Sequence, residues 1–388
     1  MKRLLLLEQS EFESRLQKVR AQMNDTDALL ISDNANIYYL TGRVFAGYVY
    51  LPLHGMPLMF VRRPVGLEGD GVVYVRKPEQ IVETLGLNMP ASIGLELDVT
   101  SYSDIERLKH VFDGARVVNA SPMMEAARAV KTQREIELIS ASGVKQERVY
   151  RRVPHLYQEG MTDLELQVEI ERVSRLEGCL GQFRISGNSM ELFMANILVG
   201  ENADTPTPYD FAMGGEGLDP SLPVGVNGSI IKPSDSVMVD ANGNYTGYMT
   251  DMTRTFAVEK LAPLALKAHK CSMDICHAIA EAGRPGVEAR TLYELAVNMA
   301  RDARLHEYFM GHRQKAGFVG HGIGIEINER PVVAPRSHDI LAEGNVVAIE
   351  PKFVIPGTGA VGIENTYVVE SDGMRCLTNA PEEITYFE

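Results

Sequence analysis

The spacing of apolar residues in the first third of the chain alternates between helical and strand-like patterns. Phe12, Leu16, Val19 and Met23 recur at the spacing of one face of an amphipathic helix. Later runs predict four strands, at 28–31, 48–53, 58–61 and 93–97, and two helices, at 78–84 and 103–111. Because helix and strand signals alternate, we expect an α/β domain here and place it at 1–123.

The remaining part, 124–388, carries longer helical patterns and segments rich in Val, Ile, Tyr and Gly. Helices are expected at 133–151, 163–176, 264–282 and 291–302, and strands within 236–258 and 318–386. Strands therefore stand on both sides of the last two helices. This order predicts a second, α+β domain, in which two similar halves fold against one another.

Length and composition agree with this division. A chain of 388 residues is too long for one ordinary core, and 45% hydrophobic with 23% charged residues is typical of a globular protein. The net charge of −14 makes nucleic acid and anionic membranes poor partners. The apolar run at 4–7 is too short for a signal peptide, and the four cysteines form no CxxC pair, so we expect a cytoplasmic protein with free thiols.

The first candidate for chemistry is a pair of aspartates in a predicted hairpin. Asp240 and Asp251 flank Asn242-Gly243-Asn244, a strong turn signal between two β-prone runs. A hairpin centred between Tyr245 and Thr246 would set the two aspartates directly opposite each other, with Cβ atoms roughly 5 Å apart.

A second pair has the same arrangement. Glu350 and Glu364 lie at equal distances from Gly357 in Pro356-Gly357, which marks a chain reversal. Two like charges about 4 Å apart repel by roughly 4 kcal/mol at an effective dielectric near 20, so such pairs need a shared proton or a cation between them. The alternative for either pair alone is a pair of solvated carboxylates on an exposed strand face.

A histidine between glycines is the third element. His321 stands in Gly320-His321-Gly322-Ile323-Gly324, where nothing bulky shields its imidazole. A lone histidine is more often structural than a ligand. Together with four carboxylates, however, it makes an oxygen-rich donor set that suits two divalent ions better than one, with Mn²⁺, Co²⁺, Fe²⁺ and Zn²⁺ as candidates.

The series Asp240, Asp251, His321, Glu350, Glu364 resembles the metal ligands of the creatinase, aminopeptidase P and prolidase family of "pita-bread" metallopeptidases. The resemblance extends over nearly the whole chain. It includes the segments Asp251-Met252-Thr253-Arg254-Thr255, Ile349-Glu350-Pro351, Asn36-Ile37-Tyr38-Tyr39-Leu40-Thr41-Gly42 and Arg128-Ala129-Val130-Lys131. It implies a creatinase/prolidase-like N-terminal α/β domain followed by a pita-bread catalytic domain, and usually a homodimer.

The resemblance also implies roles for these residues. Asp240 would bind one ion, His321 and Glu350 the other, and Asp251 and Glu364 would bridge the two, with Mn²⁺ as the first expectation. A hydroxide held between the ions would be the nucleophile. Glu350 and His321 are the catalytic candidates, with Glu350 passing a proton to the leaving nitrogen. The implied activity is hydrolysis of Xaa-Pro or related small peptide bonds, as in an Xaa-Pro dipeptidase or aminopeptidase.

The sequence departs from that family at two positions. Asn328 and Pro223 stand where prolidase and aminopeptidase P usually have histidines that donate hydrogen bonds to the substrate. Loss of one such donor costs roughly 10²–10³ in rate in a comparable oxyanion site. The substrate-binding residues therefore stay open. Two alternatives remain: hydrolysis of a non-peptide C–N bond, as in creatinase-type relatives, and a catalytically degenerate metal- or peptide-binding protein.

Overall fold

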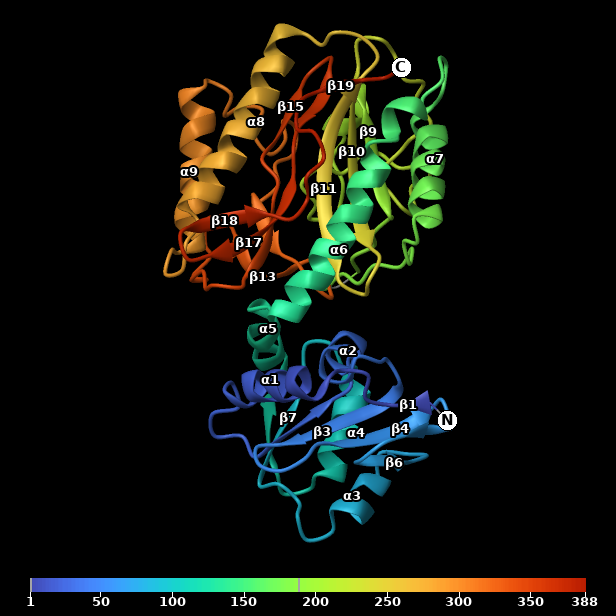
Figure 1. Ribbon diagram of the computed structural model, residues 1–388, viewed down its shortest axis with the longest axis vertical. Coiled ribbons are helices and arrows are strands. Elements are labelled where there is room, and N and C mark those ends of the chain that lie inside the picture. The colour runs from blue at the N-terminus through green and yellow to red at the C-terminus, as the bar shows by residue number, and fades with distance from the viewer. Residues whose placement is uncertain (1, 188) are drawn as a thin grey trace. The chain divides into compact units, whose positions relative to one another are not determined.

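The computed structural model describes residues 2–187 and 189–388, which form two compact units, Met1–Arg128 and Ala129–Glu388 (Figure 1). Among the described residues, no helix combines the length and apolar character that a membrane crossing requires.

The first unit is built on a six-stranded mixed sheet with the strand order β6-β4-β3-β2-β7-β8. β3 pairs antiparallel with β2 and β4, and the pairs β4–β6, β2–β7 and β7–β8 are parallel. The strands are β1 (Lys2–Arg3), β2 (Ala28–Ile31), β3 (Ala46–Pro52), β4 (Leu58–Arg63), β5 (Leu67–Glu68), β6 (Val72–Tyr74), β7 (Ser92–Leu95) and β8 (Arg116–Asn119). The helices are α1 (Gln9–Arg20), α2 (Asn34–Thr41), α3 (Gln80–Leu85), α4 (Tyr102–Val111) and α5 (Ser121–Ala129).

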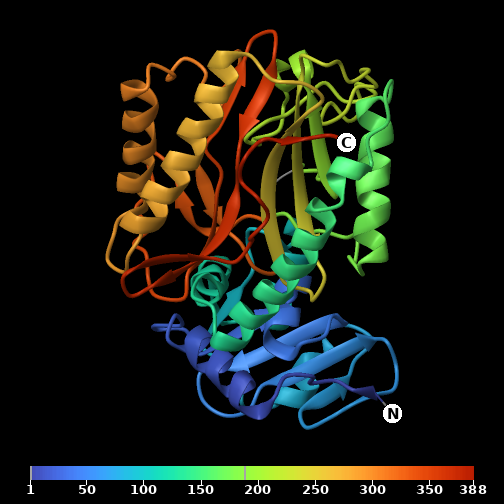
Figure 2. The ribbon, with the colours of Figure 1, turned by 45° about the horizontal axis from the view of Figure 1, so that its top comes forward.

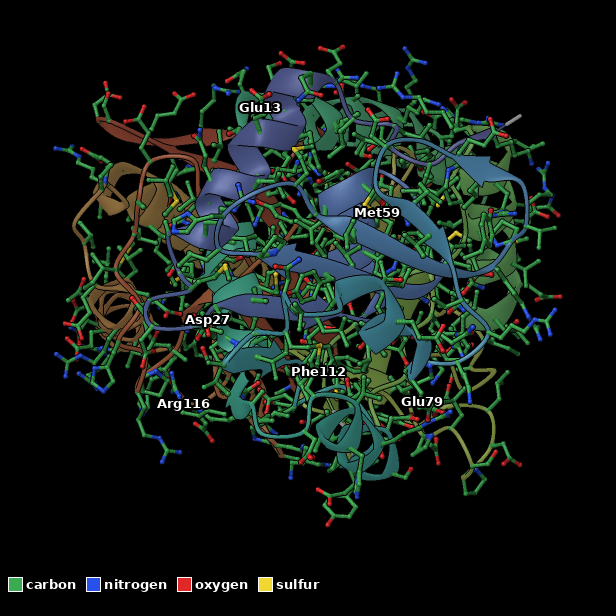
Figure 3. The ribbon with its side chains drawn as sticks, turned by 90° about the horizontal axis from the view of Figure 1, so that it is seen from below. Glu13, Asp27, Met59, Glu79, Phe112 and Arg116 are labelled. Carbon is green, nitrogen blue, oxygen red and sulfur yellow. The ribbon has the colours of Figure 1, made fainter. Side chains whose placement is uncertain are left out.

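The core of this unit lies between the sheet and its helices. Apolar side chains of the sheet, α3 and α4 form one buried cluster that includes Phe112, whereas Glu13 lies on the exposed face of α1 (Figure 3). The α/β character predicted for this part of the chain is confirmed. Helix α2 was not predicted from the sequence. It begins where the Asp33 side chain accepts from Ala35 N and Asn36 N, and it ends at Gly42 with φ +72°.

The second unit contains two larger sheets and a separate hairpin. The strand orders are β19-β11-β10-β9 and β13-β12-β14-β17-β18, and β15 pairs with β16. The strands are β9 (Ala195–Val199), β10 (Ser236–Asn244), β11 (Met249–Ala257), β12 (Gly320–Gly322), β13 (Glu329–Val333), β14 (Val346–Ile349), β15 (Lys352–Ile355), β16 (Gly359–Gly362), β17 (Asn365–Glu370), β18 (Gly373–Cys376) and β19 (Thr385–Tyr386). The helices are α6 (Gln133–Tyr150), α7 (Asp163–Leu176), α8 (Pro263–Ala282) and α9 (Ala289–Asp302), with 3₁₀ turns at Val153–His155 and Gly200–Asp204.

The second unit consists of two halves of similar construction. Helices α6 and α7 pack on the sheet of β9–β11, and α8 and α9 pack against β13, β15, β16 and β18, so the strands lie between two pairs of helices (Figures 1 and 2). Each half has its own buried apolar cluster. The predicted pair of similar halves is confirmed, and the strands that carry the candidate ligands lie in the middle of the unit.

Candidate metal centre

The two aspartates lie on one face of the β10–β11 hairpin, but they are not directly opposite. Asp240 pairs with Thr253, and Asp251 pairs with Asn242, so the predicted register was wrong by two residues. Gly243 lies inside β10 and is not part of the turn. Thr250 and Gln146 pack closely against it, and a Cβ at this position would lie 2.5 Å from Thr250 Oγ1. The turn lies later, at 245–248, and a shift by two residues keeps both carboxylates on the same face.

Thr253 connects the first aspartate to the second carboxylate pair. It is the partner of Asp240 in the β10–β11 ladder, and on its other side it forms an isolated bridge with Glu364. Its hydroxyl Oγ1 donates to Glu364 Oε2 over 2.8 Å. Glu364 is thereby positioned next to the face that carries Asp240 and Asp251.

The predicted opposition of Glu350 and Glu364 is confirmed. Lys352 pairs with Gly362 in the β15–β16 hairpin, and Ile349 pairs with Asn365 in the β14–β17 ladder. Both glutamates lie between these two ladders, where the strands pass from the five-stranded sheet into the hairpin. Their side chains are almost fully buried, at 5% and 1% exposure for Glu350 and Glu364.

The residues after Asp251 hold the Glu364 segment in place. Arg254 is 2% exposed and donates to Glu364 O over 2.8 Å and to Asn365 Oδ1 over 2.7 Å. Thr255 Oγ1 donates to Gly362 O over 2.9 Å. The segment Asp251–Thr255 therefore supplies one carboxylate of the site and three side chains that fix the strand bearing another.

His321 reaches the same place from β12. Its Nε2 lies 3.3 Å from Glu350 Oε1, and its Nδ1 lies 3.1 Å from Gly322 O. Gly320 must lack a side chain, because a Cβ there would lie 2.4 Å from Ala348 O on the neighbouring strand β14. The backbone carbonyl at Gly322 suits a histidine whose Nδ1 carries the proton and whose Nε2 is free to act as a ligand.

All five candidate ligands converge. Within the described residues, their ligand atoms form two groups of three, and the atoms in each group lie within 4.8 Å of one another. The groups are Asp251, His321 and Glu364, and Asp240, Glu350 and Glu364.

A lysine that the sequence analysis missed lies inside this cluster. Lys352 Nζ is 2.8 Å from Asp240 Oδ2, 2.7 Å from Glu350 Oε2 and 3.3 Å from Glu364 Oε2, and its side chain is 0% exposed. Lys352 stands two residues after Glu350 in a strand-forming run, and residues at this spacing in a strand face the same side. That alternation was the available signal.

The crowded carboxylates shift one another's titration. Burial and the nearby Glu364 raise the pKa of Asp251 well above its usual range. Burial and Glu350 raise the pKa of Glu364 to about 8. Burial also acts on Glu350, but Lys352 and His321 outweigh it and lower the pKa of Glu350 to about 2. The site therefore keeps an ionised Glu350 beside carboxylates that need a further cation.

The Asp251, His321 and Glu364 group fits a divalent ion. Glu364 Oε2 accepts from Thr253 and Lys352, whereas Glu364 Oε1 is buried without a hydrogen-bond partner among the described residues. A buried carboxylate oxygen without a donor is costly, and an ion removes that cost. One imidazole with carboxylates is a donor set that suits Mn²⁺, Co²⁺, Fe²⁺ or Zn²⁺.

A pocket opens onto the cluster, and Asp240, Asp251, His321 and Glu350 are among its lining residues. The other described lining residues include Asn196, Asp210, Asn242 and Asn328, but no lysine or arginine. Most of the wall is apolar: Ile185, Met190, Leu192, Phe193, Phe211, Met213, Val224, Phe318 and Ile327. The site can therefore hold an apolar group beside a cluster of carboxylates.

Asn328 and Pro223, the two residues that depart from the family pattern, lie in different places. Asn328 lines the pocket, but its side chain is engaged with the backbone of Ser186: Oδ1 accepts from Ser186 N over 2.8 Å, and Nδ2 donates to Ser186 O over 2.9 Å. Pro223 is not among the lining residues, and its carbonyl accepts from Thr207 Oγ1 over 2.8 Å. Asn328 thus has one of its two amide N–H groups engaged with the backbone, and Pro223 has no side-chain donor.

Comparisons with known proteins agree with this geometry. Residues 137–371 match the family model described as metallopeptidase family M24, and residues 15–130 match the creatinase/prolidase N-terminal domain. The Xaa-Pro dipeptidase of Pyrococcus horikoshii is 25% identical over 93% of this chain and 95% of its own. The Xaa-Pro dipeptidase of Lactobacillus helveticus is 25% identical over 94% and 95%.

Solved structures show the same fold. The Xaa-Pro dipeptidase from Bacillus anthracis has a TM-score of 0.80 at 21% identity, covering 97% of this chain and 99% of its own. The X-Pro aminopeptidase from Thermotoga maritima has a TM-score of 0.79 at 21% identity, covering 95% and 99%. The expected creatinase/prolidase and pita-bread architecture is confirmed, and with it an enzyme of the metallopeptidase class that uses divalent metal ions. The chain belongs to metallopeptidase family M24.

Proposed function

We propose that this enzyme is a metal-dependent hydrolase of Xaa-Pro or related small peptide bonds. The observation that carries the proposal is the convergence of Asp240, Asp251, His321, Glu350 and Glu364, of which all but Glu364 line a largely apolar pocket. The Xaa-Pro dipeptidases among its relatives support the choice of substrate class. These five residues are the proposed metal ligands, and Mn²⁺ remains the first choice of ion.

Bound divalent metal would supply Lewis-acid polarisation of the scissile carbonyl and activation of water near neutral pH. Glu350 would accept a proton from the attacking water and deliver it to the leaving nitrogen. Its position suits this role, because Lys352 contacts Glu350 Oε2 and keeps the carboxylate ionised before the reaction. His321 orients the carboxylate on one side, and its own ring is fixed by the Gly322 carbonyl.

The pocket wall supports small, apolar substrates. Its aromatic and aliphatic side chains can cover a proline ring or a neighbouring apolar side chain. Because no described lining residue is a lysine or an arginine, the free carboxylate of a dipeptide gains no ion pair with the pocket wall. We therefore expect Xaa-Pro amides and tripeptides to be cleaved at least as well as Xaa-Pro dipeptides.

Metal removal tests the proposal. Chelation should abolish cleavage of a panel of Xaa-Pro dipeptides, tripeptides and amides, and added Mn²⁺, Co²⁺ or Zn²⁺ should restore it. The readout is the rate of product formation by amino-acid analysis, with a peptide that lacks proline as the specificity control. Full activity in the stripped enzyme would contradict metal dependence.

A second candidate, hydrolysis of a non-peptide C–N bond, is favoured by one observation. Asn328 and Pro223 replace the two histidines of prolidase-type enzymes, one Asn328 N–H is engaged with Ser186 O, and Pro223 does not line the pocket. Metal binding without cleavage of any peptide in the panel would favour this candidate over a peptidase. The cytoplasmic location and the homodimer stay predictions.

Thr253 gives a test that leaves the ligands intact. Replacing Thr253 by valine keeps the shape of the side chain but removes the hydrogen bond to Glu364 Oε2. Loss of a hydrogen bond that orients a metal ligand typically costs 10–100-fold in metal affinity, so we expect a decrease of about tenfold or more. Chelator competition measures the affinity, and Thr385→Val, at a half-buried threonine far along the chain, serves as the control. Equal affinities in the two variants would contradict the role of Thr253.

A further inference from the structure

Lys352 contacts the same three residues that make up one of the two potential ion sites. Its Nζ lies within hydrogen-bond distance of Asp240, Glu350 and Glu364, which together form the second group of candidate ligands. We propose that the Lys352 ammonium group takes one of the two cation positions of this centre, so that a single divalent ion at Asp251, His321 and Glu364 completes it. This inference rests on the proposed metal-dependent function and changes the expected number of ions.

The contacts of Lys352 are those of a built site. An ammonium group has three N–H donors, and here each faces a different carboxylate, at 2.8, 2.7 and 3.3 Å. A transition-metal ion would bind the same oxygens at roughly 2.0–2.2 Å and would therefore overlap the ammonium group. The two cations exclude each other at this position.

The lysine is also held there by its backbone. Lys352 O accepts from Met310 N over 2.8 Å, and Lys352 lies opposite Gly362 in the β15–β16 hairpin. The side chain is 0% exposed, so an ion that displaced the ammonium group would leave a buried charge without a partner. The penalty for such a charge is several kcal/mol in real proteins, which opposes displacement.

Charge balance alone does not choose between one ion and two. The cluster contains four carboxylates, from Asp240, Asp251, Glu350 and Glu364. One divalent ion with the ammonium group leaves one negative charge, and two divalent ions with it leave one positive charge, so the inference rests on the contacts of Lys352. The buried Glu364 Oε1, which lacks a hydrogen-bond partner among the described residues, shows that the cluster still has a carboxylate oxygen available for an ion.

Metal stoichiometry tests the inference directly. The full-length protein is stripped with a chelator, reloaded with Mn²⁺, freed of excess ion, and assayed for metal per chain by mass spectrometry. We expect about one ion per wild-type chain and about two per chain in Lys352→Ala and Lys352→Gly. The electron paramagnetic resonance spectrum should change from the hyperfine pattern of an isolated Mn²⁺ to the broadened signal of an exchange-coupled pair.

Lys131→Ala is the matched control. Lys131 is also buried and pairs at 2.9 Å with the carboxylate of Glu329, which is not one of the candidate ligands. The Lys131→Ala substitution removes the same charge as Lys352→Ala and should leave the metal content at about one ion per chain. Circular dichroism checks the fold of each variant, and if both Lys352 variants fail to fold, the wild-type stoichiometry and spectrum decide alone.

Two coupled ions in the wild-type chain, no bound ion, or a folded Lys352→Ala variant that still binds one ion would each overturn the inference. None of these readouts depends on cleavage. A wild-type chain with one ion but no peptidase activity would therefore retain the inference and reject the proposed substrate class. A wild-type chain with two ions and metal-dependent peptide cleavage would reject the inference about Lys352 and retain the proposed function.

Discussion

Replacement of Glu350 by glutamine is expected to lower kcat/KM for peptide cleavage by about 10²–10⁴, the range typical of a lost general acid–base group. The amide has nearly the same shape as the carboxylate, but it can neither accept a proton from water nor deliver one to the leaving nitrogen. Its nitrogen would also face the His321 imidazole or the Lys352 ammonium group, which contact Glu350 Oε1 and Oε2. Steady-state kinetics with a saturating divalent ion measures the effect.

Loss of metal is the alternative explanation for an inactive Glu350→Gln variant, and metal content separates the two. If Asp251, His321 and Glu364 hold the ion, the variant should keep it while losing activity. Glu370→Gln, which alters an exposed carboxylate paired with Arg375, is the control and should retain wild-type rates. Wild-type activity in Glu350→Gln would contradict the proposed proton transfer.

Local signals in the sequence predicted the arrangement of Glu350 and Glu364 because the turn between them is short and strongly marked. Pro356-Gly357 fixes the reversal, and Gly357 takes the φ of +77° that favours glycine. The ladders on both sides of the two glutamates then share one register. The opposed glutamates follow from these local features alone.

The register of Asp240 and Asp251 depended on tertiary packing and was therefore predicted wrongly. Asn242-Gly243-Asn244 has the composition of a turn, but Gly243 serves instead to admit Thr250 and Gln146 close to β10. Gln146 belongs to α6, a hundred residues earlier, so no local pattern carried this information. The turn itself uses Gly247, with φ +89°.

Lys352 shows a different limit of the sequence. A lysine in an apolar strand is usually an edge or surface residue, since lysines are almost never fully buried unless paired. Its three partners come from β10, from the residue after β14 and from the residue before β17, and only the folded unit brings them together. The family resemblance predicted the ligands but contained no information about this cation.

Replacement of Arg254 by leucine is expected to destabilise the second unit by about 3–5 kcal/mol, because it leaves several buried acceptors without a donor. The guanidinium group donates to the carbonyls of Thr253, Glu364, Ala380 and Pro381 and to the side chain of Asn365, and it is 2% exposed. Urea unfolding of the metal-stripped protein, followed by circular dichroism, measures the change.

Arg254→Lys should recover little of this stability. An ammonium group cannot reproduce the planar guanidinium donors that join β11 to the segments 364–365 and 380–381. Arg375→Leu removes an exposed arginine and should change stability by about 0.5 kcal/mol or less. If Arg254→Leu were as stable as Arg375→Leu, the hydrogen bonds of Arg254 would not hold the Glu364 segment. Because Glu364 belongs to both groups of ligands, the expected outcome also links folding to chemistry: the same buried arginine that stabilises the junction of the two halves fixes the carboxylate on which ion binding depends.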